Sequence, residues 1–355
     1  MSSQDPTLPL VTSYQAEAKP CPAGKMSAYI GIDLGGNAVN VTAFRDGDFL
    51  IEEMIEVPSR VKEGPDACIA QLVLGFSKAL EASGLTKSQI KGVGLDGPGP
   101  ASAEGVMGST GGTNFGHPGY GNFDMRGALQ DAIGIQTSYL NDGNAAGLYS
   151  HWTHFGSNPK KSSISLIIGT GMGGAVVTHG RIQVGKVGFA AELGHTKLPH
   201  DWNPMEWMEC HCNCGYINDL ESVASLTAIE KNLLPHYLPR HPGHPLQGMD
   251  FYSAAKKVRG LAEEGDEMSL QIFRCQTWAI GAHIEMMINI LDMDAVFIGG
   301  GGIQASEEFR AFYLKSIRES IKFRPEQADL EILIAPHGDM AGARGAALYA
   351  QSVFS

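Results

Sequence analysis

Ala28-Tyr-Ile-Gly-Ile-Asp-Leu-Gly-Gly36 is an apolar run that ends in two glycines, and Ile164-Ser-Leu-Ile-Ile-Gly-Thr-Gly-Met-Gly-Gly174 repeats that design later in the chain. Each predicts a buried β-strand that enters a glycine-rich turn. After each turn a second strand is expected, over 39–44 and 175–178, followed by a hairpin turn. The sequence therefore predicts a duplicated motif of strand, glycine turn, strand and hairpin, with both turns facing one cleft.

Further strands and helices are predicted around the two motifs. A strand over 137–140 delivers Asn141 and Asp142 to the start of a helix, and a strand over 295–298 leads into Gly299–Gly302. The other predicted elements are strand 49–57, helix 65–83, strand 90–95, helix 144–152, strand 163–168, helix 220–232, helix 268–291, strand 331–335 and helix 341–352.

Composition describes a globular chain and excludes some partners. The 355 residues suit two domains that share a cleft. With 26 basic and 38 acidic residues the net charge is −12, and no basic stripe occurs, so no nucleic acid partner is expected. Residues 1–26 lack an apolar signal-peptide core and are predicted to be a disordered tail. The sequence contains no apolar run of about 18 residues, which is the length that would predict a membrane span.

Cysteine usage favours a reducing compartment. Six cysteines occur, and Cys210, Cys212 and Cys214 are too close together for an ordinary disulfide framework. Such spacing is typical of a metal site or of reduced thiols. We therefore expect the protein in the cytoplasm.

The glycine turns suit phosphate binding, because glycine lets backbone N–H groups approach and surround an anion. Asp33, at the end of the first strand, is placed to hold Mg²⁺ or its waters. Alternatively, these are two ordinary hairpin turns with a turn-forming aspartate, but the duplicated context favours phosphate. The glycines concerned are Gly35, Gly36, Gly169, Gly171 and Gly173.

Seven short segments follow one another along the chain: Gly31-Ile-Asp-Leu-Gly-Gly36, Asp96-Gly-Pro-Gly-Pro100, Asn141-Asp142-Gly-Asn144, Gly169-Thr-Gly-Met-Gly-Gly174, Glu192-Leu-Gly-His195, Cys212-Asn-Cys-Gly215 with Glu221, and Gly299–Gly302. Together they resemble the ROK family of sugar kinases and repressors, within the actin-like ATPase and hexokinase superfamily. The resemblance covers nearly all of 28–350. It implies an α/β, two-domain actin-like ATPase (ribonuclease H-like) fold with a duplicated β-meander-plus-helices core and a deep interdomain cleft. It also implies a small domain over 27–145 and 338–355, and a large domain over 146–337 that carries a zinc-loop insertion.

The resemblance implies an ATP-dependent sugar kinase, a transferase of carbohydrate metabolism. Asp142 matches the family's general base, which takes a proton from the attacking sugar hydroxyl. Asn141 or Asp142 is alternatively a helix N-cap, and the two roles are compatible. Gly299–Gly302 is alternatively a tight strand-to-helix connection. Besides the glycines of the two turns, the family's nucleotide contacts fall on Asp33, Asn37, Thr170, Gly300 and Gly301.

The family's sugar contacts also map onto this chain. For Glu221, the spacing from Asn218 is equally typical of a capping box. For His195, the alternative is a satisfied core histidine. The matching positions are Asn114, Asn141, Asp142, Glu192, His195 and Glu221.

The family's structural zinc is held by one His and three Cys, and this chain matches only part of that set. His195, Cys212 and Cys214 match, whereas Asp219 stands at the position of the third Cys. Asp219 can ligate zinc through oxygen, Cys210 is an alternative fourth ligand, and His211 is a further candidate. The other interpretation is a reduced cysteine loop in which Asp219 is an N-cap.

A second departure affects the first glycine turn. The family's turn usually continues with Thr-Lys, whereas this chain has Asn37-Ala38. The lost hydroxyl and positive charge suggest impaired turnover, so a sugar-binding protein with weak catalysis is an alternative. The repressor alternative is not expected, because only about 27 residues precede the first strand, too few for a helix-turn-helix domain.

The sequence thus predicts phosphorylation of a glucose-like hexose, at O6, with ATP, Mg²⁺ and a structural Zn²⁺. An N-acetylhexosamine is the alternative substrate. The resemblance further implies a homodimer.

Overall fold

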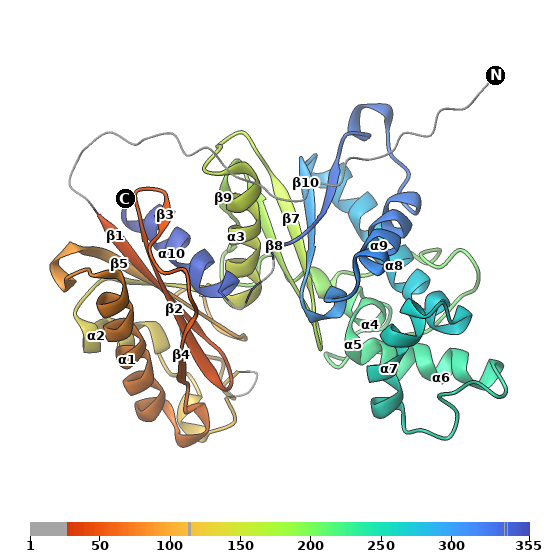
Figure 1. Ribbon diagram of the computed structural model, residues 1–355, viewed down its shortest axis with the longest axis horizontal. Coiled ribbons are helices and arrows are strands. Elements are labelled where there is room, and N and C mark those ends of the chain that lie inside the picture. The colour runs from red at the N-terminus through yellow and green to blue at the C-terminus, as the bar shows by residue number, and fades with distance from the viewer. Residues whose placement is uncertain (1–26, 113–114, 337, 339) are drawn as a thin grey trace.

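The computed structural model describes residues 27–112, 115–336, 338 and 340–355. Two β-sheets stand side by side, each flanked by helices (Figure 1). The expected tail over 1–26 lies outside the described residues, so it stays a prediction.

The first half of the chain forms one sheet with helices on its outer face. Its strand order is β3-β2-β1-β5-β6, with β4 also paired to β2. Buried apolar side chains fill the space between this sheet, α1 and α2. The elements are β1 (Ala28–Leu34), β2 (Ala38–Arg45), β3 (Asp48–Phe49), β4 (Ile55–Pro58), α1 (Pro65–Ser83), β5 (Ile90–Gly97), α2 (Met125–Ile133), β6 (Thr137–Asn141) and α3 (Asp142–Phe155).

The second half forms a five-stranded sheet of order β11-β10-β7-β8-β9, covered by a thicker helical layer. The largest core of the molecule lies between this sheet and those helices, with α8 buried along most of its length. The elements are β7 (Ser163–Ile168), β8 (Met172–Thr178), β9 (Arg181–Ile182), α4 (Glu221–Ala224), α5 (Leu226–Ala228), α6 (Leu234–Tyr237), α7 (Phe251–Glu263), α8 (Glu267–Leu291), β10 (Ala295–Gly299), α9 (Glu307–Glu319), β11 (Glu331–Ile334) and α10 (Ala341–Phe354).

The two sheets have the same topology, which confirms the predicted duplication. In each, an antiparallel meander of three strands (β1-β2-β3 and β7-β8-β9) continues on its other side into two parallel strands. The glycine turns connect β1 to β2 and β7 to β8. Because the two turns occupy equivalent places in equivalent sheets, they can serve one ligand from two sides.

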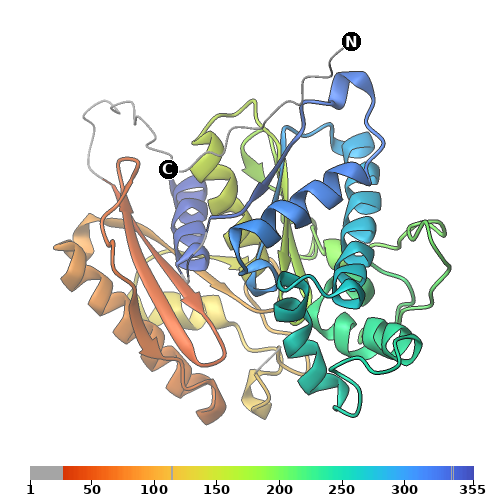
Figure 2. The same cartoon turned by 45° about the vertical axis from the view of Figure 1, so that its right-hand side comes forward.

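Helices α3 and α10 lie between the two sheets and join them (Figure 1 and Figure 2). Apolar residues of both helices and of both meanders form one shared core. The contact is close: a Cβ added at Gly345 of α10 would lie 1.9 Å from the carbonyl oxygen of Ala145 in α3. The expected domain boundary at 145/146 falls inside α3, which packs on both sheets, so that boundary stays a prediction.

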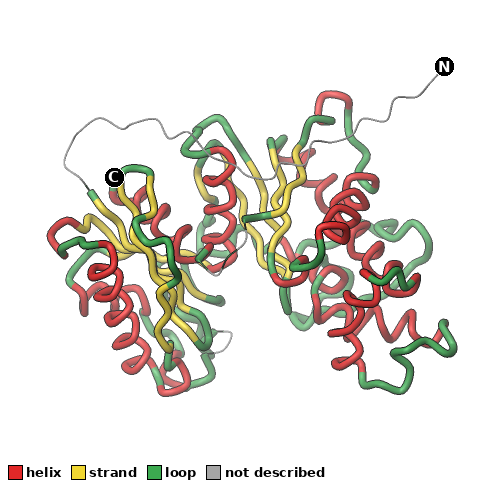
Figure 3. The backbone as a smooth tube through the Cα atoms, in the orientation of Figure 1, coloured by secondary structure: helices red, strands yellow, loops and turns green. Residues whose placement is uncertain are grey.

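Two predicted elements are wrong in detail (Figure 3). The strand expected over 49–57 is split, because β3 and β4 pair with opposite ends of β2. The helix expected over 220–232 breaks at Ser225, whose side chain caps α5 by accepting a hydrogen bond from Ala228 N. After the break, Leu226 N donates to Gly169 O of the second glycine turn at 2.9 Å. A long-range contact therefore replaces a local helical bond.

Within the described residues, none of the helices has the length and apolar character needed to traverse a lipid bilayer.

Candidate active site

A cavity of about 790 Å³ opens between the two sheets, where the end of β1 at Asp33, the second glycine turn and the N-termini of α3 and α10 converge. It collects most of the residues that the sequence predicts for sugar and nucleotide. Asn114 lies outside the described residues. The predicted residues on the cavity wall are Asp33, Asn141, Asp142, Gly169, Gly171, Gly173, Glu192, His195, Glu221, Gly300 and Gly301.

Asp142 is the first residue of α3 and Asn141 is its N-cap. The Gly143 N–H donates to Asn141 Oδ1 at 3.0 Å and to Asp142 Oδ1 at 2.7 Å. A carboxylate in the first helical turn is favoured by the positive end of the helix dipole. Capping and a position on the cavity wall are therefore combined in the same two residues.

The site is acidic. Asp33, Asp142, Glu192 and Glu221 all line the cavity, and none of its described lining residues is Lys or Arg. Asp142 is exposed toward the cavity, yet desolvation by the surrounding walls raises its pKa, while hydrogen bonds from Gly143 and Asn141 oppose the rise. Desolvation likewise raises the pKa of Glu192, against the opposing charge of His195. The described side chains therefore give the cavity a negative charge, which disfavours an anionic ligand unless cations accompany it.

Glu221 connects the second glycine turn to the cysteine-rich loop. Its Oε2 accepts a hydrogen bond from Met172 N at 2.8 Å, and its Oε1 accepts one from Cys212 Sγ at 3.3 Å. A Cβ at position 171 would lie 2.6 Å from Glu221 Oε2, so any larger residue there would displace the carboxylate from this position. The carboxylate thus holds the turn in place and lines the cavity at the same time.

The capping box between Asn218 and Glu221, the alternative role considered for Glu221, is not formed, because Glu221 bonds to Met172 N and Cys212 Sγ. Asp219 caps α4 instead, accepting from Ser222 N at 2.9 Å. Asn218 adopts a positive φ of 51° and turns its side chain toward Cys210 N, which donates to its Oδ1 at 2.7 Å. The cap sits one residue later than the spacing suggested, which leaves Glu221 available to the cavity.

The first glycine turn differs from the second. Gly35 N donates to Ala38 O at 2.9 Å, and Asn37 O accepts from Ser59 N at 3.0 Å. Asp33 lines the cavity, but Gly35, Gly36 and Asn37 are not among its lining residues. Thr170 of the second turn is also absent from the lining, although its carbonyl accepts from Thr227 N at 3.3 Å.

The turn after β10 has the geometry of a strand-to-helix connection that also faces the cavity. Gly300 has a φ of 91°, and a Cβ there would lie 2.2 Å from Ile168 O. Only glycine fits both conditions. Gly301 O accepts a hydrogen bond from Arg259 Nη1 of α7 at 2.9 Å, which fixes the turn from outside.

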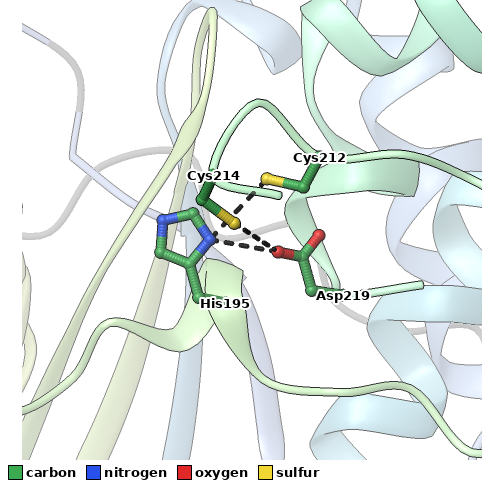
Figure 4. Close-up of side chains that lie close together, drawn as sticks. All are labelled: His195, Cys212, Cys214 and Asp219. Atoms are coloured by element: carbon green, nitrogen blue, oxygen red, sulfur yellow. Dashed lines mark hydrogen bonds and ion pairs between the residues drawn. The ribbon is translucent and has the colours of Figure 1, made fainter. Parts of the chain in front are cut away.

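Four residues of the cysteine-rich loop and the segment before it form a compact cluster (Figure 4). His195, Cys212, Cys214 and Asp219 each offer one ligand atom, and these atoms lie within 4.8 Å of one another. His195 Nδ1 lies 3.1 Å from Asp219 Oδ2, and its other ring nitrogen points away from the cluster (Figure 4). One nitrogen, two sulfurs and one carboxylate oxygen suit four-coordinate zinc.

The alternative ligands lie elsewhere. Cys210 is fully buried in the hydrophobic core of the second half, and burial raises the pKa of its thiol to about 12. His211 is exposed and pairs with Glu209, with 3.1 Å between Nε2 and Oε1. The structure therefore favours Asp219 as the fourth member of the cluster, and Asp219 is a helix N-cap as well.

Two residues near the site were not among the predicted contacts. Phe189 lines the cavity with 49% of its surface exposed. Asp96, at the end of β5, pairs in register with Asp33 of β1. Burial, and then the charges of Asp33 and Asp142, raise the pKa of Asp96 well above its ordinary value. A sequence signal existed for Asp96, because Gly31-Ile-Asp33 and Gly94-Leu-Asp96 share one pattern.

Comparison with known proteins identifies relatives over nearly the whole chain. A family model described as "ROK family" matches residues 29–353. A glucokinase from Thermotoga maritima is 32% identical over 284 residues, covering 78% of this chain and 83% of that protein. An N-acetylmannosamine kinase from Salmonella typhi is 27% identical over 328 residues, covering 91% and 98%. The crystal structure of a ROK hexokinase from Thermus thermophilus has a TM-score of 0.72 at 27% identity, covering 92% of this chain and 98% of that one.

Proposed function

Because the chain belongs to the ROK family, we propose that it is an ATP-dependent sugar kinase that phosphorylates a glucose-like hexose at O6. The observation that carries the proposal is the meeting of Asp142, Glu192 and Glu221 with the second glycine turn in one cavity. Carboxylates accept hydrogen bonds from sugar hydroxyls, and the backbone N–H groups of a glycine turn donate hydrogen bonds to phosphate oxygens.

In the proposed reaction, Asp142 accepts the proton of the attacking sugar hydroxyl. The sugar oxygen forms a bond to the γ-phosphorus, the bond from that phosphorus to the β–γ bridging oxygen breaks, and ADP leaves. Mg²⁺ bound with the nucleotide neutralises phosphate charge, and Asp33 is the residue we assign to it. Glu192, His195, Glu221 and Asn141 orient the sugar by hydrogen bonds.

An assay across sugars tests this proposal. ADP release is measured with glucose, mannose, N-acetylglucosamine and N-acetylmannosamine, since the named relatives include both glucokinases and N-acetylmannosamine kinases. We expect the largest kcat/KM with glucose. A higher kcat/KM for an N-acetylhexosamine would identify that sugar, and not glucose, as the substrate. No turnover of any sugar by the folded protein would contradict the kinase function.

Impaired catalysis is the second candidate, favoured by Asn37-Ala38 and by the absence of the first-turn glycines from the cavity lining. Calorimetric titration separates the two. Sugar binding without measurable ATP affinity would favour a sugar-binding protein over a kinase.

The pH dependence of the reaction is expected to report on Asp142. The general base must be ionised, and desolvation raises its pKa above the ordinary aspartate value. As pH falls through that raised pKa, the ionised fraction and therefore kcat/KM fall. The acid limb should accordingly lie at higher pH than for a fully solvated aspartate, in initial rates measured with the coupling enzymes in excess at every pH. An acid limb at or below the ordinary aspartate pKa would contradict this prediction.

We further propose that the cluster of His195, Cys212, Cys214 and Asp219 binds a structural zinc ion. Asp219→Asn keeps an acceptor for the α4 cap but supplies a weak neutral ligand, so it should retain less zinc than wild type. Asp219→Cys should retain more. Zinc per chain is measured after dialysis against a chelator. Cys210→Ala is the control and should retain as much zinc as wild type. Zinc loss in that variant alone would show that Cys210, and not Asp219, is the fourth ligand.

A further inference from the structure

Two aspartates from neighbouring strands lie together beneath the start of α10. Gly31 pairs with Gly94, and Asp33 with Asp96, in the parallel register of β1 and β5. Residues two apart in a strand share a face. A Cβ at Gly31 would lie 1.8 Å from Ala343 O of α10, which identifies that face, and a Cβ at Gly342 would lie 2.8 Å from Asp33 Cγ. Both carboxylates therefore point toward the N-terminus of α10; Asp33 lines the cavity, whereas Asp96 is fully buried beside it.

Asp96 is buried in an unusual way. Its exposed fraction is 0%, and neither carboxylate oxygen accepts a hydrogen bond from an N–H or hydroxyl donor of the described residues; its hydrogen-bonding neighbour is the Asp33 carboxyl. An isolated buried carboxylate costs far more free energy than a paired one, so such groups bind a metal, find a partner or stay protonated. For two neighbouring carboxyl groups, either a shared proton or a bound cation offsets the repulsion, and the experiment below distinguishes the two.

Protein side chains do not supply that charge. Asp33 and Asp142 are the neighbouring groups whose charges act on Asp96, and the described cavity lining contains neither Lys nor Arg. The first glycine turn, Gly35-Gly36-Asn37-Ala38, carries no positively charged side chain either. Hard divalent cations prefer carboxylate oxygens, and affinity rises with the number of charged ligands.

We propose that Asp96 is a second carboxylate ligand, beside Asp33, of the divalent cation site, and that this pair lets the nucleotide-free protein bind the cation. The inference rests on the proposed function for the identity of the nucleotide site. A cation held in advance by two aspartates would supply the positive charge toward the phosphates that no Lys or Arg of the described cavity lining supplies.

The test is titration of the nucleotide-free protein with Mn²⁺, with free Mn²⁺ followed by its EPR signal and Mg²⁺ as competitor. Wild type should bind one Mn²⁺ per chain, and Asp96→Asn and Asp33→Asn should each weaken binding at least tenfold. Asp131→Asn, an exposed aspartate on α2, is the matched control and should bind as wild type. Equal Mn²⁺ affinity of Asp96→Asn and wild type would overturn the inference.

Thermal melting with and without Mn²⁺ shows that each variant is folded, because a ligand that binds only the folded state raises Tm. We expect Mn²⁺ to raise Tm for wild type and Asp131→Asn but not for Asp96→Asn. If Asp96→Asn does not fold, Asp96→Ser gives the same comparison with a smaller neutral side chain.

Measuring sugar turnover by the wild type distinguishes a failure of this inference from a failure of the proposed function. Turnover by wild type together with unchanged Mn²⁺ binding in Asp96→Asn contradicts only the role of Asp96. Mn²⁺ binding that depends on Asp96, without turnover of any sugar by wild type, contradicts only the kinase.

Discussion

Asp142→Asn is expected to lower kcat by about 10²–10⁴-fold, the range that a positioned general base contributes. The amide has the shape of the carboxylate but cannot accept the hydroxyl proton. Gly143 N–H keeps its bond to Asn141 Oδ1, so the start of α3 should stay in place. The sugar and ATP dissociation constants and Tm should therefore stay close to wild type, as measured by calorimetry and thermal melting.

The matched control is Asp131→Asn, which makes the same chemical change on the exposed surface of α2 and should leave kcat unchanged. A wild-type kcat for Asp142→Asn would falsify the general-base assignment. A parallel loss of sugar affinity would assign Asp142 to binding rather than to proton transfer.

Much of the fold was predictable from sequence because its signals are local. The apolar strands, the glycine turns and the helix start at Asn141 and Asp142 each follow from a few adjacent residues, and α1 has the predicted bounds. The duplicated topology follows because the same local pattern occurs twice.

The errors arise where distant contacts override local pattern. The helix expected over 220–232 breaks because Leu226 N bonds to the glycine turn, nearly 60 positions earlier in the chain. For α4 the sequence left caps at Asn218 and at Asp219 open, and the structure has Asp219, because Asn218 is occupied with the backbone of Cys210 and Met208. Neither partner can be read from the spacing of the capping residues.

The candidate site was predicted unevenly for the same reason. The sequence places Asp142, Glu192, His195 and Glu221 on separate segments, and only the packing of the two sheets brings them to one cavity. Asp96 was missed because its importance depends on its register with Asp33, a pairing across 63 positions. The first turn was expected to contribute its glycines, but only Asp33 reaches the described wall.

Gly345→Ala is expected to destabilise the protein strongly, although the substitution is small. In an exposed helix the change would stabilise by about 1 kcal/mol, because alanine is the better helix former. At position 345 the added Cβ would lie 1.9 Å from Ala145 O and 2.4 Å from its carbonyl carbon, both backbone atoms of α3. Separating α3 from α10 would disturb the core that joins the two sheets, so we expect a loss of about 1–3 kcal/mol or more.

Gly260→Ala provides the matched control, because Gly260 lies in α7 and an added Cβ there meets no atom within 4 Å. That variant should unfold at a higher temperature than wild type, and Gly345→Ala at a lower one, in the same calorimetric experiment. The opposite signs separate packing from helix propensity, since the chemical change is identical. A Tm for Gly345→Ala at or above wild type would mean that α3 and α10 can separate without cost, and that the two sheets are joined less tightly than their shared core implies.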